Sequence, residues 1–390
     1  MPFSCDLCDN TALEQVYAPQ NSTRRLTVWL CSHCGLLQSL PRTDRAERRP
    51  ATASAGADWG NLRYGKGFRA EANLATLRPF LNRQRPLRVL DIGASRGAFG
   101  LEFKAAYPKA SIFGIEPDER IVGAWAGKIG FTWLHARLED TRLEKEGFDV
   151  IYSCHTLGHL KSPREALLAH HANLAPNGYL MLEVPNTAII GSDDIVEEFF
   201  IDKHLYHFSP RSLARLLTVC GFRAVAIGDP RDTVNITVVA VKAESASAAL
   251  SADPREVEAA AALISAYHAQ RLQNLNALVQ VAAMIDAMAP RKVAIWGAGR
   301  LLNSLINNGG LRPQALAAVV DKHRIRYAQE AHGIRLTAPE DLGNVRPDIV
   351  VVMSRSFANE IRIEAQERAP GCEVLAYTDL LARAKTQMAA

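Results

Sequence analysis

Two short segments, VLDIGASRG at residues 89–97 and IFGIEPD at residues 112–118, constrain the fold of this chain more than any other feature. Each begins with the apolar, β-branched run that is typical of a buried strand. The first then passes into a glycine-bearing turn, and the second ends in an acidic residue. Such a turn lets the backbone approach a nucleotide-like cofactor, and such an acid binds ribose hydroxyls. The two segments predict an α/β domain with a nucleotide-type ligand at one edge of its sheet.

The residues around these segments alternate between strand and helix patterns. Strands are expected at 87–92, 111–115, 131–134, 148–153 and 178–184, and helices at 68–81, 97–106, 118–128 and 163–173. A further helix begins at Ser209-Pro210 and ends before Gly221, which are start and stop signals for a helix. Two β-rich runs, FRAVAI and VNITVVAV, follow as a predicted antiparallel hairpin. This order favours a parallel sheet with helices on both faces.

Four of the seven cysteines form two Cys-x-x-Cys pairs, and a strand-rich stretch separates the pairs. The pairs are Cys5/Cys8 and Cys31/Cys34. Four thiolates in two such turns suit tetrahedral Zn²⁺, and they leave no open position for water, so the predicted role is structural. The alternative is two redox pairs or a chance spacing.

The chain beyond Lys242 changes character. AESASAALSADP interrupts the periodicity, residues 254–288 then form a predicted amphipathic helix, and VAIWGAGR, ALAAVVD and DIVVVMS predict three strands of another α/β unit. We therefore expect a zinc-binding module at 1–45, a central domain at 60–242 and a smaller Rossmann-like domain at 250–390. The polar stretch at 42–61 is the predicted linker between the first two.

Composition excludes several classes of protein. The chain has 390 residues, 48% of them hydrophobic, and a formal net charge of +4. No apolar run is long enough for a membrane span, and the first ten residues lack the apolar core of a signal peptide, so a cytoplasmic protein without membrane contact is expected. The basic run Arg42, Arg45, Arg48 and Arg49 reads as a solvated loop, and nucleic acid is not an expected partner.

The cofactor turn has the spacing Asp91-x-Gly93-x-x-x-Gly97, and Ser95 lies where a Gly-x-Gly-x-x-Gly fingerprint would place its middle glycine. That difference disfavours NAD and leaves open a Rossmann-type core with another cofactor or none. Glu116 ends the second strand at the distance expected for a ribose-binding acid. The predicted cofactor residues are Asp91, Gly93, Ala94, Gly97, Glu116, Pro117, Leu138, Glu139, Ser153 and His155. The spacing resembles the S-adenosylmethionine site of class I methyltransferases.

The order of units resembles the sugar C-methyltransferases that act on nucleotide-linked keto-deoxysugars. CSHCGLLQS, VLDIGASRGAFG, FDVIYSCHTLGHL, LMLEVPN, VAIWGAGRLLNSLI and PDIVVVMSRSFANEI carry the resemblance, which covers nearly the whole chain. It implies a zinc module, a class I methyltransferase Rossmann-like core that binds S-adenosylmethionine, and a C-terminal Rossmann-like domain that binds substrate.

The resemblance also implies a base. The family's Tyr-x-Glu-His segment, whose His removes a proton beside the ketone, corresponds here to Ile201-Asp202-Lys203-His204. His204 is kept, but Tyr and Glu are replaced. Gly158 replaces the Glu that precedes His159, and Thr233-Val234-Asn235 replaces a Gly-Gly-Ser. The departures fall in the substrate motifs, whereas the cofactor motifs match.

These residues define the expected chemistry. His204 is the predicted base, while Lys203, His207 or Tyr206 would stabilise an oxyanion or contact a diphosphate. Gly297, Gly299, Arg300 and Asn303 would admit a diphosphate at a helix N-terminus, or form only a structural turn. The leading expectation is C-methylation of a nucleotide-linked deoxysugar. O-methylation of a sugar or small metabolite is the enzymatic alternative, and a binding protein that keeps the fold is the non-enzymatic one.

Overall fold

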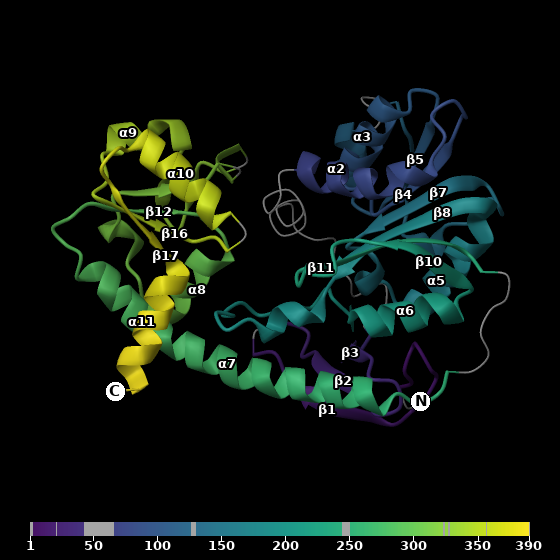
Figure 1. The fold of residues 1–390 in the computed structure, drawn as a ribbon, viewed down its shortest axis with the longest axis horizontal. Coiled ribbons are helices and arrows are strands. Elements are labelled where there is room, and N and C mark those ends of the chain that lie inside the picture. Colours follow the sequence, from purple (N-terminus) through teal and green to yellow (C-terminus); the bar gives the residue numbers. More distant parts are fainter. Residues whose placement is uncertain are drawn as a thin grey trace. The chain divides into compact units, whose positions relative to one another are not determined.

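The computed structural model describes residues 3–20, 22–42, 66–125, 130–243, 250–322, 324–326, 328–355 and 357–389. The predicted linker lies outside this part of the chain, except for Arg42. The chain divides into two compact units, one formed by residues 1–190 with 200–264 and the other by 191–199 with 265–390 (Figure 1). These units differ from the three predicted domains, because the cysteine module shares a unit with the central sheet. None of the described helices has both the length and the apolar composition of a membrane span.

The first unit is built on a seven-stranded sheet with the order β10-β11-β8-β7-β4-β5-β6. Its strands are β4 (Arg88–Ile92), β5 (Ser111–Glu116), β6 (Thr132–His135), β7 (Phe148–Cys154), β8 (Leu174–Pro185), β10 (Phe222–Ile227) and β11 (Asn235–Lys242). Strands β4 to β8 are parallel, while β11 pairs antiparallel with both β8 and β10. The α/β fold, the parallel sheet and the closing hairpin are thereby confirmed.

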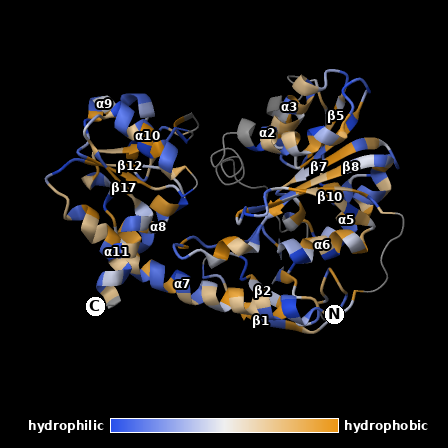
Figure 2. Cartoon of the chain, in the orientation of Figure 1, coloured by the Kyte–Doolittle hydropathy of each residue, from blue (hydrophilic) through white to orange (hydrophobic). Residues whose placement is uncertain are grey.

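Helices cover both faces of this sheet (Figure 1). Helices α2 (Lys66–Leu77) and α3 (Ala98–Ala106) pack on one face, where Phe103 and Tyr107 are fully buried against Val150 and Met181. Helices α5 (Pro163–Asn173) and α6 (Pro210–Val219) pack on the other. The short α4 (Glu119–Trp125) follows β5. Successive strand residues point to opposite faces of the sheet, so each strand contributes side chains to the hydrophobic core on both faces. The central strands are accordingly predominantly hydrophobic (Figure 2).

A second, smaller sheet in the same unit has the order β1-β2-β3-β9. Strands β1 (Leu13–Tyr17), β2 (Thr27–Cys31) and β3 (Leu37–Leu40) come from the cysteine module, whereas β9 (Tyr206–His207) comes from the segment that precedes α6. The pairing of β3 with β9 therefore joins the module to the predicted substrate segment.

The second unit has a six-stranded sheet with the order β14-β15-β13-β12-β16-β17, in which only β14 is antiparallel. The strands are β12 (Val293–Trp296), β13 (Ala318–Val320), β14 (Glu330–Ala331), β15 (Ile334–Thr337), β16 (Ile349–Val352) and β17 (Glu373–Ala376). Its helices are α8 (Arg300–Gly309), α9 (Leu342–Val345), α10 (Ala358–Arg368) and α11 (Tyr377–Ala389). The long α7 (Pro254–Asp286) begins in the first unit and ends in the second. The predicted C-terminal α/β unit is thus present.

Candidate active site

The order of the seven strands marks where a ligand can bind. Strand β4 pairs with β5 on one side and with β7 on the other, so successive crossover connections leave it in opposite directions. In open α/β sheets, ligands bind at the carboxyl ends of the strands beside such a reversal. Asp91, Glu116, Ser153 and His155 all lie at this edge, at or just beyond the ends of β4, β5 and β7.

The glycine turn after β4 has the backbone that the sequence predicts. Gly93 and Gly97 have φ values of +69° and +76°, in the left-handed region where a Cβ is strained. A Cβ at Gly93 would also lie 2.2 Å from Oγ1 of Thr156. The amides of Gly93 and Ala94 both donate to the carbonyl of Ile115, at 2.9 and 3.0 Å, which holds the turn against β5.

Two buried carboxylates lie beside the turn. Glu116, 8% exposed, accepts hydrogen bonds from the amides of Ser95 at 2.8 Å and Asp118 at 3.0 Å. Burial raises its pKa. Asp91 is 2% exposed, and burial together with the charge of Glu116 raises its pKa to about 8. Buried acids beside this turn suit a ligand that brings hydroxyl groups and positive charge.

The other predicted cofactor residues surround the same edge. Ser153 is 1% exposed, and its Oγ has no hydrogen-bond partner among the described residues, so a ligand can satisfy it. Leu138 is buried, Glu139 accepts from the amide of Lys161 at 3.3 Å, and the carbonyl of Pro117 lies 3.2 Å from Nε2 of His135. This edge fits the predicted nucleoside cofactor.

A polar cluster around His155 contains residues that the sequence analysis did not nominate. Nε2 of His155 lies 2.9 Å from Oδ1 of Asn235 and 3.2 Å from Oε1 of Glu183. The Arg69 guanidinium lies 2.7 Å from the same Glu183 oxygen. Glu183 is 4% exposed, and although burial opposes ionisation, the contacts with His155 and Arg69 lower its pKa. Its place within LMLEVPN, near the carboxyl end of β8, is the one sequence signal that could have located it.

His204, the predicted base, lies against a second imidazole. The rings of His204 and His159 are stacked with their centroids 4.9 Å apart and 17° between their planes. Burial, followed by the positive charge that His159, Lys203, His207 and His155 can carry, holds the pKa of His204 well below its usual range. The neighbouring backbone explains Gly158, because a Cβ there would lie 2.9 Å from the carbonyl oxygen of Tyr206. Lys203 itself is exposed.

Tyr206 and His207 are both buried in β9 and have partners in the cysteine module or its surroundings. The hydroxyl of Tyr206 donates to the carbonyl of Lys161 at 2.7 Å, and the Arg42 guanidinium lies over its ring. A ring nitrogen of His207 lies 2.9 Å from Oγ of Ser39, and burial lowers the pKa of His207 to about 3. These contacts hold β9 in place.

The four paired cysteines form one cluster. Sγ of Cys5 lies 3.5 Å from that of Cys34, and Sγ of Cys8 lies 3.6 Å from that of Cys31. All four sulfurs lie within 4.8 Å of one another. A tetrahedral zinc with bonds of about 2.3 Å places its sulfurs about 3.8 Å apart, so the cluster has the size of a Cys₄ site. A disulfide, by contrast, needs about 2.05 Å.

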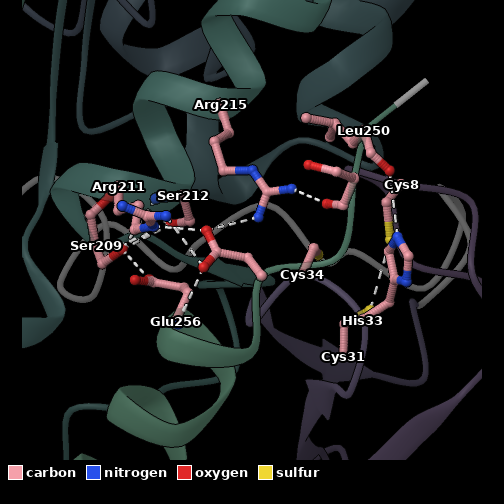
Figure 3. A network of polar contacts seen from close by, with 12 residues as sticks. Cys8, Cys31, His33, Cys34, Ser209, Arg211, Ser212, Arg215, Leu250 and Glu256 are labelled. Carbon is pink, nitrogen blue, oxygen red and sulfur yellow. Dashed lines mark hydrogen bonds and ion pairs between the residues drawn. The ribbon is translucent and has the colours of Figure 1, made fainter. Parts of the chain in front are cut away.

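The turn between Cys31 and Cys34 is bonded to the start of α7 (Figure 3). A ring nitrogen of His33 lies 3.2 Å from the carbonyl of Leu250, and the His33 carbonyl accepts from the amide of Asp253 at 2.7 Å. Asp253 in turn pairs with Arg211 and Arg215 of α6, at 2.5 and 2.9 Å. The module is therefore part of the framework of the first unit.

In the second unit, the predicted diphosphate turn follows β12. Gly297 has a φ of +119°, and a Cβ there would lie 2.8 Å from the carbonyl oxygen of Met353, whereas Gly299 faces open space. Arg300 begins α8, and Asn303 lies within hydrogen-bond distance of His332. Asp321 accepts from the amide of Ala298 at 2.9 Å, which ties the turn to β13.

An ion-pair network within the second unit was not predicted. Arg355, after β16, lies 2.9 Å from Glu197 and also pairs with Asp194. Burial would raise the pKa of Glu197, but Arg355 lowers it to about 2. Glu197, 7% exposed, keeps one oxygen without a partner among the described residues.

A family profile described as a methyltransferase domain matches residues 66–227, and one described as C2185-like, N-terminal, matches residues 289–370. A tRNA U34 carboxymethyltransferase from Alcanivorax borkumensis is 25% identical over 226 residues, which are 52% of this chain and 69% of that protein.

Two solved structures are similar over about half of the chain. A 1,6-didemethyltoxoflavin-N1-methyltransferase from Burkholderia thailandensis, with 1,6-didemethyltoxoflavin and S-adenosylhomocysteine bound, has a TM-score of 0.36 and 19% identity, and the match covers 47% of this chain and 80% of that one. An S-adenosylmethionine-dependent methyltransferase from Clostridium acetobutylicum has a TM-score of 0.39 and 10% identity, covering 47% and 93%. The matching profile and the sheet that it spans identify residues 66–227 as a class I methyltransferase domain, and the chain as an S-adenosylmethionine-dependent methyltransferase.

Proposed function

We propose that this methyltransferase transfers a methyl group to a nucleotide-linked deoxysugar, with carbon beside a ketone as the leading acceptor. The observation that carries the proposal is that one chain contains both an S-adenosylmethionine-type edge, in the first unit, and a second α/β unit, whose glycine turn at residues 297–299 ends in the N-terminus of α8. The resemblance of both units to sugar C-methyltransferases supplies the substrate class.

S-adenosylmethionine would supply an electrophilic methyl group at this edge. Glu116 would bind its ribose hydroxyls, Asp91 would hold its amino-acid portion, and a polar atom of the cofactor would satisfy the buried hydroxyl of Ser153. The protein must also remove a proton from the acceptor and exclude water. His204 is the base that the resemblance implies, and burial keeps its imidazole neutral.

We also propose that Cys5, Cys8, Cys31 and Cys34 bind a structural Zn²⁺ and that the protein is cytoplasmic. The distances among the four sulfurs support the first proposal. The second is supported by the seven cysteines, all of them among the described residues, none of which forms a disulfide, as in a reducing compartment.

One experiment tests the function. The purified chain would be incubated with methyl-labelled S-adenosylmethionine and a panel of thymidine-, uridine- and guanosine-diphosphate keto-deoxysugars, with bulk tRNA as the comparison. We expect S-adenosylhomocysteine to bind in calorimetry, and label to enter one sugar nucleotide. Label in tRNA instead would make tRNA the substrate, as for the tRNA carboxymethyltransferase to which the chain is similar. Cofactor binding without transfer to any acceptor would favour a binding protein.

A further inference from the structure

Two imidazoles lie near the methyl-transfer edge, and they differ in what holds them. His204 stacks on His159, and its pKa is lowered first by burial and then by other groups that can carry positive charge. His155 instead has a carboxylate partner and an amide partner. The proposed function needs one proton acceptor, so this difference helps to decide which of the two imidazoles is the general base.

The contacts of His155 set its tautomer. Nδ2 of Asn235 lies 3.4 Å from Oδ2 of Asp232, which turns Oδ1 of Asn235 toward His155. Glu183 is a carboxylate, so both partners of Nε2 are acceptors, and Nε2 must carry the proton. In the neutral ring, Nδ1 is then the basic nitrogen. A carboxylate that fixes the tautomer of a His and stabilises its imidazolium is the arrangement of a general base with its positioning residue.

The backbone places this ring beside the cofactor turn. His155 has a φ of +52°, an uncommon value for a residue with a side chain, and its amide donates to the carbonyl of Glu183 at 2.7 Å. The next residue, Thr156, is the one whose Oγ1 lies against Gly93. The His155 side chain is 31% exposed, whereas that of Glu183 is 6% exposed. The ring is thus accessible at the edge, while its partner Glu183 is buried. Residues held in an uncommon backbone conformation are often found at functional sites.

The cluster does not suit a metal ion. Cys154, His155 and Glu183 have ligand atoms within 4.8 Å of one another. The Arg69 guanidinium, however, lies 2.7 Å from Glu183 and 3.7 Å from Sγ of Cys154, and a fixed positive charge there opposes a cation. Arg69 instead keeps Glu183 ionised and so able to orient His155.

We infer that His155 is the general base of the methyl transfer and that Glu183 positions it. The inference rests on the proposed function. As the acceptor atom attacks, its bond to hydrogen breaks and the proton joins the lone pair of Nδ1. The electron pair left on the acceptor forms the new bond to the methyl carbon, while the pair of the old sulfur–methyl bond stays on sulfur as a neutral thioether. Glu183 stabilises the imidazolium until water takes the proton.

The tautomer can be measured without a substrate. The chain with ¹⁵N-labelled histidine and bound S-adenosylhomocysteine would be studied by NMR, with the His155 ring assigned from the loss of its signals in His155→Asn, because Asn tolerates a positive φ. We expect protonated Nε2 and unprotonated Nδ1. In Glu183→Gln the pKa of the ring should fall, because the carboxylate that favours imidazolium is gone while Arg69, Cys154 and His204 still face it. A ring protonated at Nδ1, or one whose pKa does not move, would overturn the inference.

Rate measurements with the sugar nucleotide that accepts the label then distinguish the two candidate bases, His155 and His204. His155→Gly should lower kcat by about 10²- to 10⁴-fold, with added imidazole restoring part of the rate. His204→Gly should show no rescue, and the exposed His268→Asn should match the wild type. Rescue at position 204 and not at 155 would assign the base to His204. Failure of S-adenosylhomocysteine to bind the wild type would instead refute the proposed function. If S-adenosylhomocysteine binds the wild type but not His155→Gly, His155 is a cofactor contact and not the base.

Discussion

Gly93→Ala should destabilise the first unit and weaken cofactor binding by an amount that the structure bounds. Forcing Ala to a φ of +69° costs about 1–2 kcal/mol. The new Cβ would also lie 2.2 Å from Oγ1 of Thr156, which donates to the carbonyl of Ile92 at 3.1 Å. Moving that hydroxyl away sacrifices a hydrogen bond worth about 1 kcal/mol, so the total is about 2–3 kcal/mol.

Gly130→Ala is the matched control, because Gly130 has a φ of +62° and nothing within 4 Å of its Cβ position. It should therefore cost only the backbone strain of about 1–2 kcal/mol. Urea unfolding followed by tryptophan fluorescence, in a Trp296→Phe background, reports the first unit alone, since the other four tryptophans belong to residues 1–190. S-adenosylhomocysteine affinity is measured by calorimetry in parallel.

A double-mutant cycle with Thr156→Ala isolates the steric part. Removing Oγ1 should reduce the destabilisation caused by Gly93→Ala by about 1 kcal/mol, because the remaining Cβ of Thr156 is 3.2 Å from the new Cβ. If Gly93→Ala costs no more than Gly130→Ala, or if the cycle shows no coupling, the close approach of residues 93 and 156 that defines the cofactor turn is wrong.

Three further perturbations test the rest of the site. Glu116→Gln should weaken S-adenosylhomocysteine binding about 10- to 100-fold in calorimetry, because a charged acceptor is lost, and unchanged affinity would remove Glu116 from the site. Asp91→Asn should flatten the pH dependence of the free energy of unfolding of the cofactor-free protein. The pKa of Asp91 is about 8 in the folded state and 3.8 in the unfolded state, so wild-type stability should fall as pH rises between these values. Equal slopes of stability against pH for the wild type and the variant, measured in urea titrations, would contradict this. Cys34→Ser should lower bound zinc, measured by mass spectrometry, from about one ion per chain and destabilise the first unit, whereas Cys372→Ser should retain the metal.

The fold could be read from the sequence because local signals agreed with one another. The predicted strands and helices of the central domain match the observed ones to within a few residues, since each apolar run was bounded by a glycine, a proline or a cap such as Ser209. The division into units was not predictable in the same way. It depends on packing between distant segments, such as β3 against β9, which no local pattern encodes.

The site was only partly predictable for a related reason. Gly93, Glu116 and His155 stand at fixed distances from recognisable strands, so spacing predicts them as site residues. Glu183 and Asn235 lie within β-rich runs, 28 and 80 residues from His155, where a single polar residue gives no sign of its partner. Only the antiparallel pairing of β11 with β8, beside β7, brings them together.

The cysteine module supports the substrate segment through direct contacts. Asp202 accepts hydrogen bonds from the hydroxyls of Ser22 and Thr23 at 2.5 and 2.6 Å, and the amide of Ser39 donates to the carbonyl of Leu205 at 2.8 Å. His204 lies between these two attachment points. Loosening the module should therefore displace His204 before it disturbs the glycine turn, which is held by β5 and Thr156. Chelation of the metal should accordingly lower kcat/KM for the sugar nucleotide more than the affinity for S-adenosylhomocysteine, whereas an equal loss of both would mean that the module only stabilises the unit as a whole.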